Sequence, residues 1–298
     1  MMPPSISVVI PTYNYGRYIA TAVQSVLDQT HPPDEIIVVD DGSTDDTRET
    51  IHGFGDSVRY FHQENSGVSV ARNHGVEKSV GKLIAFLDSD DYWEPTCLET
   101  AVAKFELSER IGLVHWGLRE FDSATGETIG YYLEGGEQEV AKNLLLNEGP
   151  MIAGHGAIMV RREAFFEAGG FDRDTESSED WDFCYRVTRK FDVAFVPEAL
   201  VNYRSHEGGA HRDIAGLDRG MSRFYEKAFA TDDVAVLKLR RRAYGNFHKI
   251  MAGSYFHVGA YGKSMSHAAR SILTKPGNIA YFLRLPFRRL ASRRRTSD

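Results

Sequence analysis

The fold follows most directly from residues 35–43, which read EIIVVDDGS. The four residues after Glu35 are all apolar and β-branched, which is typical of a strand buried on both faces of a sheet. We expect this strand to stop near Asp40, because Asp, Gly and Ser favour turns. Ser43 and Asp46, three residues apart, resemble a capping box, so the next helix is expected to begin directly after Ser43.

The same pattern recurs on both sides of this stretch. Apolar runs at residues 6–10 and 83–87 predict two further strands, and residues 58–61 predict a shorter one. Residues 19–27 carry apolar side chains at helical spacing, and a second helix is expected over residues 68–80. Repeated strand–helix–strand units predict an α/β fold whose mixed, mostly parallel sheet is flanked by helices.

Polar clusters follow three of the predicted strands, at residues 11–15, 40–41 and 88–91. The carboxyl ends of parallel strands meet at one edge of a sheet, and α/β proteins bind their ligands there. Crowded carboxylates repel one another, so such a cluster requires a cation or hydrogen-bond donors nearby. We therefore expect a binding site at this edge.

Beyond Pro95 the pattern changes. Strand and helix signals are mixed up to about residue 210, and residues 193–204 are expected to be extended. After residue 211 the pattern is helical, which predicts a C-terminal helical extension over residues 211–298.

Composition and cysteine content narrow the class of protein. The chain has 298 residues, 42% of them hydrophobic and 26% charged. These values are typical of a globular protein and exclude disordered and collagen-like chains. Cys97 and Cys184 lie far apart, which excludes a zinc site built on cysteines and argues against a disulfide framework. No apolar run is long enough to span a bilayer, and residues 1–5 do not open a secretory signal, so we expect a cytoplasmic location.

Charge is distributed unevenly along the chain. Residues 238–298 contain 14 Lys and Arg and one acid, a net charge of +13, which leaves −20 of the total of −7 on residues 1–237. The acidic body argues against nucleic acid as a partner. From residue 281 onward six arginines alternate with large apolar residues, which predicts peripheral contact with an anionic membrane at its inner face. A solvated basic tail is the alternative.

Several residue types at the predicted sheet edge suit the binding of a nucleotide. Asp88 and Asp90, directly after a strand, suit a hard divalent cation such as Mg²⁺ or Mn²⁺ that also binds phosphate oxygens. A solvated turn is the alternative. Asp41 is able to accept a hydrogen bond from a nucleobase, or it forms only an Asp-Gly turn. Arg72 suits the recognition of a base or a diphosphate, or it is an exposed arginine.

Together these motifs resemble the family 2 glycosyltransferases, which are inverting enzymes of the GT-A fold that use nucleotide-diphospho sugars. The resemblance covers residues 5–210. It implies a glycosyltransferase domain over residues 1–210, with a nucleotide-binding half at 1–95 and an acceptor-binding half at 96–210. Five motifs carry it in this order: SVVIPTYN (7–14), VVDDGSTD (38–45), NSGVSVARNHG (65–75), FLDSDD (86–91) and EDWD (179–182).

On the donor side, the resemblance implies contacts between this chain and each part of a nucleotide sugar. Pro11, Tyr13 and Asp41 would line the nucleobase pocket, with Arg72 nearby. Asp88 would contact the ribose.

The resemblance also implies a metal site and a catalytic base. Asp90 would coordinate a divalent cation, Mn²⁺ or Mg²⁺. His206, in the stretch YRSH at its end, would approach the metal or the diphosphate, or it is a surface histidine. Asp180 would remove the proton from the acceptor hydroxyl, with Glu179 in support. The alternative for Asp180 is a helix N-cap.

The acceptor side is less defined. His155 and Trp181 are candidates for lining the acceptor cleft, and Trp181 equally fits a core position. The resemblance implies a glycan or lipid-linked acceptor in cell-surface polysaccharide or glycolipid synthesis.

Two other functions stay open. One is a metal-dependent nucleotidyltransferase, although residues 11–17 lack its Gly-rich, basic phosphate loop. The other is a non-catalytic protein that binds sugar nucleotides.

Overall fold

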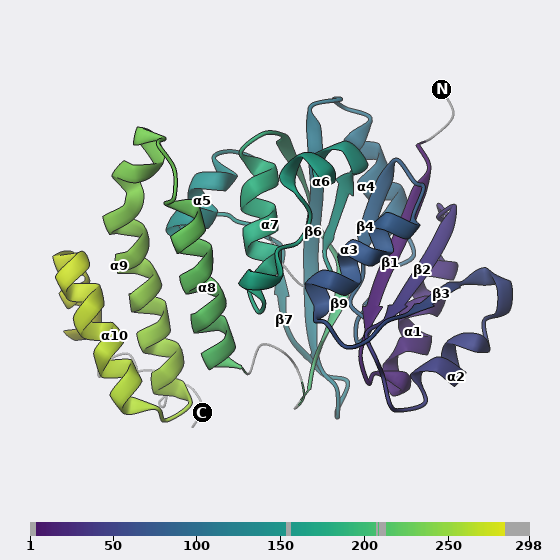
Figure 1. Cartoon of the computed structure of the whole chain (residues 1–298), viewed down its shortest axis with the longest axis horizontal. Coiled ribbons are helices and arrows are strands. Elements are labelled where there is room, and N and C mark those ends of the chain that lie inside the picture. Colours follow the sequence, from purple (N-terminus) through teal and green to yellow (C-terminus); the bar gives the residue numbers. More distant parts are fainter. Residues whose placement is uncertain (1–3, 153–155, 207, 209–212, 284–298) are drawn as a thin grey trace. The chain divides into compact units, whose positions relative to one another are not determined.

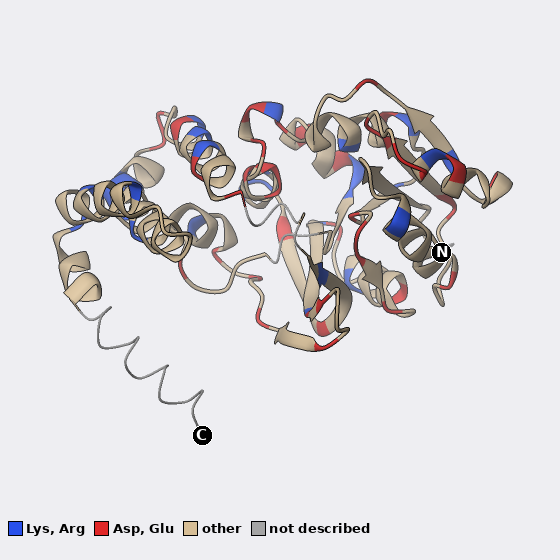
Figure 2. Cartoon of the chain, turned by 90° about the horizontal axis from the view of Figure 1, so that it is seen from below, with Lys and Arg blue, Asp and Glu red and all other residues tan. Residues whose placement is uncertain are grey.

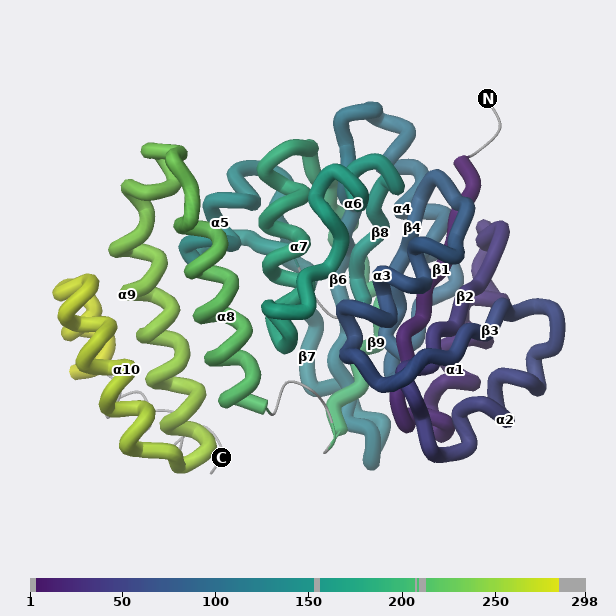
Figure 3. The backbone as a smooth tube through the Cα atoms, in the orientation of Figure 1, coloured from purple at the N-terminus to yellow at the C-terminus, as the bar shows by residue number. Residues whose placement is uncertain are grey.

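The computed structural model describes residues 4–152, 156–206, 208 and 213–283. The chain divides into two compact units, each taken separately below (Figures 1 and 3). The first unit comprises residues 1–144 and 148–212, and the second comprises residues 145–147 and 213–298.

A mixed sheet forms the centre of the first unit. Within the described ranges the strands lie in the order β3-β2-β1-β4-β8-β6-β9-β5, and β7 pairs with β6. Strands β1 to β4 pair in parallel, as do β6 and β9, whereas β8 runs antiparallel to both of its neighbours. The strands are β1 (Ile6–Thr12), β2 (Glu35–Asp40), β3 (Arg59–His62), β4 (Leu83–Phe86), β5 (Tyr92–Trp93), β6 (Ile111–Asp122), β7 (Thr128–Tyr132), β8 (Ile158–Arg161) and β9 (Asp192–Ser205).

Strand β2 is buried on both faces, as its apolar run predicts. Ile36 and Val38 belong to the large core cluster on one face of the sheet. Ile37 and Val39 pack with Ala71 of α3 on the other face. The expected fold class is therefore confirmed: an α/β unit with a mixed sheet flanked by helices, followed by a helical region.

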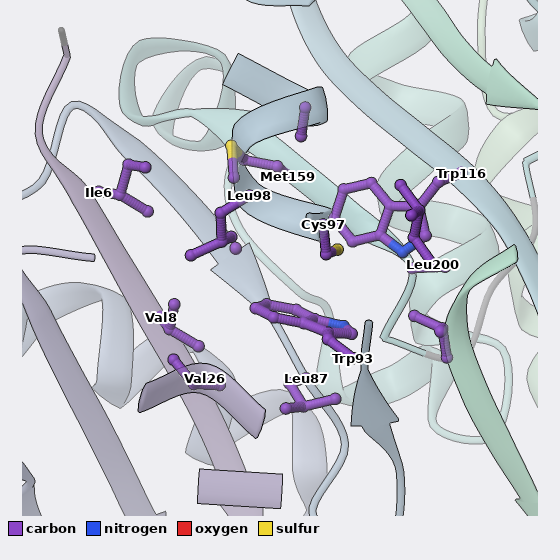
Figure 4. Close-up of a cluster of buried hydrophobic side chains, with 14 of the residues drawn as sticks. Ile6, Val8, Val26, Leu87, Trp93, Cys97, Leu98, Trp116, Met159 and Leu200 are labelled. Carbon is purple, nitrogen blue, oxygen red and sulfur yellow. The ribbon is translucent and has the colours of Figure 1, made fainter. Parts of the chain in front are cut away.

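Helices cover the sheet and complete its core. Residues of α1 and α4 enter the large cluster shown in Figure 4, where the rings of Trp93 and Trp116 meet edge to face with centroids 5.9 Å apart. This cluster holds β1, β4 and β6 at fixed positions, and so fixes the loops that follow β1 and β4. The helices of this unit are α1 (Gly16–Leu27), α2 (Thr47–His52), α3 (Val68–Lys78), α4 (Cys97–Phe105), α6 (Arg162–Ala168), α7 (Glu179–Thr188) and, up to residue 144, α5 (Val140–Leu146).

The capping box expected at Ser43 and Asp46 is wrong. Helix α2 begins at Thr47, and the side chain of Asp46, at the N-cap position, forms no capping hydrogen bond. Ser43 Oγ instead accepts a hydrogen bond from the backbone N–H of Asn14 at 2.9 Å. Gly42 has a φ of +85°, and a Cβ there would lie 2.9 Å from the backbone nitrogen of Asn65. The residues after β2 are thus used to join loops rather than to start a helix.

The second unit is helical. Its helices are α8 (Ile214–Ala228), α9 (Val234–His257) and α10 (Tyr261–Thr274), followed by a short 3₁₀ turn at Pro276–Asn278. The Asp213 and Asp233 side chains cap α8 and α9 by accepting backbone N–H groups of the first turn. In the part of the chain that the structure describes, no helix is long and apolar enough to cross a membrane. The arginine-rich stretch 284–298 lies outside the described residues.

Candidate active site

The loops after β1 and β2 are joined by direct hydrogen bonds. Asn14 Oδ1 accepts the backbone N–H of Thr44 at 2.8 Å, in addition to the bond between Asn14 and Ser43. Pro11 is buried within β1, opposite Val39. Tyr13 lies just past the strand and its side chain is exposed, so it offers an aromatic surface on which a planar ring can stack.

Asp41 organises the loop that leads into α3. Its buried carboxylate accepts hydrogen bonds from Gln63 Nε2 at 2.7 Å, from Ser66 N at 2.9 Å and from Gly67 N at 2.8 Å. A carboxylate has about four lone-pair positions, so these three bonds leave capacity for one further donor. These bonds fix the carboxylate of Asp41 beside the loop that follows β1 and carries Tyr13. The carboxylate can accept one more hydrogen bond, from an N–H group of a ligand.

Arg72, on α3, is a buried bridge between two acidic segments. Its Nη2 lies 2.7 Å from Asp88 Oδ1, and its Nη1 lies 2.9 Å from Glu179 Oε1. Burial opposes the positive charge, but Asp88 and Glu179 outweigh it and raise the pKa of Arg72. Burial raises the pKa of Glu179, and Arg72 opposes that shift. The structure thus brings together Arg72, Asp88 and Glu179, which the sequence analysis placed in one site.

Asp90 and His206 also meet, across 116 residues of chain. His206 Nε2 lies 3.0 Å from Asp90 Oδ2, and both side chains are mostly buried. The end of β9 is held against this loop, because Asp91 Oδ1 accepts the backbone N–H of Arg204 at 2.8 Å. Arg204 Nε also donates to the carbonyl oxygen of Asp90 at 2.7 Å. These two bonds place His206 beside Asp90.

Two tyrosines of the first helix region surround His206. The His206 ring lies 5.6 Å from the ring of Tyr15 and 5.3 Å from that of Tyr18. Burial raises the pKa of the Tyr15 hydroxyl, and the charges of Asp90 and Asp88 raise it further. His206 is therefore a fixed part of the site and not a freely rotating surface histidine.

The first turn of α7 carries three carboxylates with different surroundings. Glu179 pairs with Arg72, and Asp182 is buried and pairs with Arg186 at 2.6 Å. Asp180 is partly exposed, and its Oδ1 accepts the backbone N–H of Trp181 at 2.7 Å. Among the described residues no cation lies within ion-pair distance of Asp180. Among the described residues it is thus the carboxylate of this turn that pairs with no arginine.

Asp180 is one of the residues that line a small, mostly apolar pocket between α7 and the sheet. The pocket is lined by Arg72, Phe86, Gly156, Ile158, Phe171, Asp180 and Cys184. Trp181 is half-buried, and its indole N–H donates to the carbonyl of Leu144 at 3.2 Å, which fits a structural position. His155 lies outside the described residues.

The sequence analysis included Asp91 in a polar cluster and Arg204 in the stretch YRSH but assigned no role to either residue. Asp91 stands next to Asp90 in the motif FLDSDD, and Arg204 stands two residues before His206. Their bond joins residues 113 positions apart, so no local pattern predicts it. The pair Asp90-Asp91 was the one feature of the sequence that could have pointed to a role for Asp91.

Two side chains of the candidate site are possible ligands for a cation, which is fewer than a complete metal site needs. Asp90 and His206 offer an oxygen and a nitrogen ligand. Within the described part of the chain, no group of three or more His, Cys, Asp and Glu side chains is arranged to hold a metal ion.

The mixed sheet, with helices on its faces and acidic loops at its strand ends, is an α/β domain of the GT-A class. The sequence profile described as "Glycosyl transferase family 2" matches residues 7–167. The chain belongs to this family.

Curated relatives match parts of this chain. An uncharacterized glycosyltransferase of Rickettsia felis is 29% identical over 217 residues, which cover 71% of this chain and 36% of the relative. The putative teichuronic acid biosynthesis glycosyltransferase TuaG of Bacillus subtilis is 47% identical over 100 residues, 32% of this chain and 40% of that protein. The alignment to the Rickettsia felis relative thus spans about a third of that protein's length.

Solved structures share the fold. TarS 1-349 of S. aureus, in complex with UDP-GlcNAc, has a TM-score of 0.62 and 16% identity, covering 91% of this chain and 89% of its own. The mannosyltransferase PcManGT of Pyrobaculum calidifontis, in complex with GDP-Man and Mn²⁺, has a TM-score of 0.62 and 18% identity. That match covers 98% of this chain and 84% of PcManGT.

Proposed function

We propose that this chain transfers a sugar from a nucleotide-diphospho sugar to an acceptor hydroxyl, with inversion at the anomeric carbon. The observation that carries the proposal is the position of Asp180. It is partly exposed at the start of α7, it borders a small, mostly apolar pocket, and its neighbours Glu179 and Asp182 are each paired with an arginine. Membership of the family supports the reaction class.

The reaction is an in-line displacement. The acceptor oxygen forms a bond to the anomeric carbon while the bond from that carbon to the diphosphate oxygen breaks. The diphosphate leaves with the bonding electron pair, and the hydroxyl proton passes to the carboxylate of Asp180. The N-terminus of α7 stabilises negative charge at this position before the proton arrives.

We assign the donor to the loops at the ends of β1, β2 and β4. Tyr13 stacks on the nucleobase and Asp41 accepts a hydrogen bond from it, while Pro11 fixes the end of β1 beneath them. Asp88 contacts the ribose. Arg72 has both ends of its guanidinium bound to Asp88 and Glu179, so its role is to hold these carboxylates in place.

Asp90 and His206 fit a divalent cation. Their facing carboxylate oxygen and imidazole nitrogen are ligands that Mn²⁺ accepts, and Mg²⁺ accepts the carboxylate. Because two protein ligands are too few, diphosphate oxygens and water would complete the shell. When bound, the ion offsets the negative charge that develops on the leaving diphosphate. The Mn²⁺ in the PcManGT complex supports this assignment.

We further propose a glycan or lipid-linked acceptor in the synthesis of a cell-surface polysaccharide or glycolipid. The similarity to TuaG, named for teichuronic acid biosynthesis, supports this setting.

One experiment separates this proposal from its two alternatives. The full chain is incubated with UDP- and GDP-sugars and Mn²⁺, and the release of nucleoside diphosphate is measured with and without carbohydrate acceptors. Glycosyl transfer predicts release of the diphosphate, with faster release when an acceptor is present. A nucleotidyltransferase would instead release pyrophosphate from a nucleoside triphosphate and a sugar phosphate. A binding protein would release neither product.

A further inference from the structure

Helix α10 buries three polar side chains and no large apolar one. Its buried residues are Ser264, His267 and Ser271. Ser264 Oγ donates to the carbonyl of Ala252 at 2.8 Å, and Ser271 Oγ donates to the carbonyl of Gly245 at 2.8 Å, both in α9. A surface helix of a globular protein normally has the opposite arrangement, with its apolar stripe against the core. The large apolar side chains of α10 are therefore not the ones buried against the rest of this unit.

Those apolar residues lie on the outward side of α10. Tyr261 is 58% exposed, Met265 is 73% exposed and Leu273 is 79% exposed. Ile279 and Leu283, just beyond the helix, are also exposed. Single exposed apolar residues are common, but several on one side of a helix that buries only polar side chains mark a binding surface.

The exposed charged residues of α10 are all basic, and the acid that contacts this helix, Asp218 of α8, pairs with His267 on its buried side. Residues 234–283 contain eight Lys and Arg and no Asp or Glu. Lys263 and Arg270 are exposed on α10 itself. Figure 2 shows the contrast with the first unit, where acidic and basic residues are interspersed. Exposed apolar side chains flanked by cations, on a helix that itself carries no Asp or Glu, match a surface of lipid acyl chains and anionic headgroups.

We propose that the outer face of α10, defined by Tyr261, Met265 and Leu273 and flanked by Lys263 and Arg270, lies on an anionic membrane. A second copy of the same face is a poorer occupant, because a symmetric contact would bring like charges together without acids to pair them. The proposal concerns a surface on a described helix and does not depend on the proposed transfer reaction.

The apolar part of the proposal is tested by flotation of the full chain with vesicles of phosphatidylcholine and phosphatidylglycerol. The double substitution Met265→Ser/Leu273→Ser should lower the partition coefficient by about tenfold or more, because it removes two large apolar side chains from the lipid. Val80→Ser/Leu107→Ser is the matched control. These residues are 76% and 73% exposed on the first unit, and their substitution should leave binding unchanged.

The charged part is tested with a second matched pair. Lys263→Gln/Arg270→Gln should weaken binding by roughly fivefold per charge at low salt and less at high salt. Arg48→Gln/Arg110→Gln alters the net charge equally, at exposed positions of the first unit, and should have little effect. Vesicles of phosphatidylcholine alone should bind the unaltered chain weakly.

Three results would overturn the proposal. The first is equal vesicle binding by the α10 variants and their controls, which would assign the contact elsewhere on the chain. The second is the absence of binding to anionic vesicles. The third is a dimer, seen by light scattering, that Met265→Ser/Leu273→Ser dissociates while vesicles do not bind, which would identify a second copy as the occupant. Melting temperature and nucleotide-sugar turnover in solution, measured on the same variants, should stay unchanged and so separate this outcome from a failure of the proposed reaction.

Discussion

Arg72 on α3 donates a hydrogen bond to Glu179 on α7, with a distance of 2.9 Å between the nitrogen and the oxygen, and both side chains are buried. The same guanidinium holds Asp88 at the end of β4. One side chain therefore connects the loop assigned to the donor with the helix turn that carries Asp180. Its removal is expected to disturb the fold and the site together.

We expect Arg72→Met to lower the free energy of unfolding by about 3–5 kcal/mol, because it leaves buried carboxylates without their cation. Chemical denaturation measures this change. Arg110→Met is the control, since the Arg110–Asp192 pair is exposed and should contribute less than about 1 kcal/mol. Adding Glu179→Gln to Arg72→Met should recover part of the loss. Equal effects of the Arg72 and Arg110 substitutions would contradict a structural role for the buried bridge.

The assignment of Asp90 and His206 to a divalent cation makes a separate prediction. Asp90→Asn should abolish the Mn²⁺-dependent part of nucleoside diphosphate binding, because an amide is a far weaker ligand for a hard cation than a carboxylate. His206→Ala should weaken the Mn²⁺ dependence less. Thermal shift with UDP and GDP, with and without Mn²⁺, measures both effects. Unchanged Mn²⁺ dependence in Asp90→Asn would show that the ion binds elsewhere.

The free energy of unfolding should fall as the pH is lowered, because His115 is buried in its neutral form. Burial lowers the pKa of His115 to about 4 and outweighs the hydrogen bond to the carbonyl oxygen of Gly136, 2.8 Å from Nε2, which opposes this shift, so the folded chain holds the ring neutral. In the unfolded chain the ring takes up a proton near pH 6.5. Unfolding therefore binds a proton below pH 6.5, and stability falls as the pH drops from 6.5 towards 4.

This fall is measurable against a variant that does not titrate. Over that range the unaltered chain should lose about 3 kcal/mol more than His115→Gln, whose amide can still donate to Gly136. Urea denaturation at several pH values measures the difference. Parallel pH profiles for the two proteins would rule out a neutral, buried His115.

The N-terminal half of the sheet was predictable because its strands are continuous apolar runs. Residues 35–40 form β2 within the bounds expected, and both of its faces are buried. β7 (Thr128–Tyr132) was not predicted, because its residues are mostly exposed and show no alternation. β5 (Tyr92–Trp93) has two residues, too few to form any pattern.

The residue types of the site were predictable, but their pairings were not. The Asp88, Asp90 and Glu179 motifs each stand out locally as doubled acids. The bonds from Arg72 to Glu179 and from Arg204 to Asp91 join segments more than 100 residues apart, and only the folded sheet brings them together. Arg72 illustrates the difference, since a ligand contact was expected and the structure has its Nη1 and Nη2 bound to carboxylates of the chain itself.

The most direct test of the account is the turnover of Asp180→Asn with donor, acceptor and Mn²⁺ present. Asparagine can hydrogen-bond the acceptor hydroxyl but cannot take its proton, so turnover should fall by about 10²–10⁴-fold while nucleotide binding and melting temperature stay near those of the unaltered chain. Asp182→Asn, two residues further along α7, is the matched control and should mainly lower stability, because Asp182 is paired with Arg186. The N-cap position of α7 belongs to Ser178, and Asp180 is the second residue of the helix, so the alternative role of Asp180 as an N-cap is wrong. If Asp180→Asn retains its turnover, Asp180 is not the base and the base lies elsewhere.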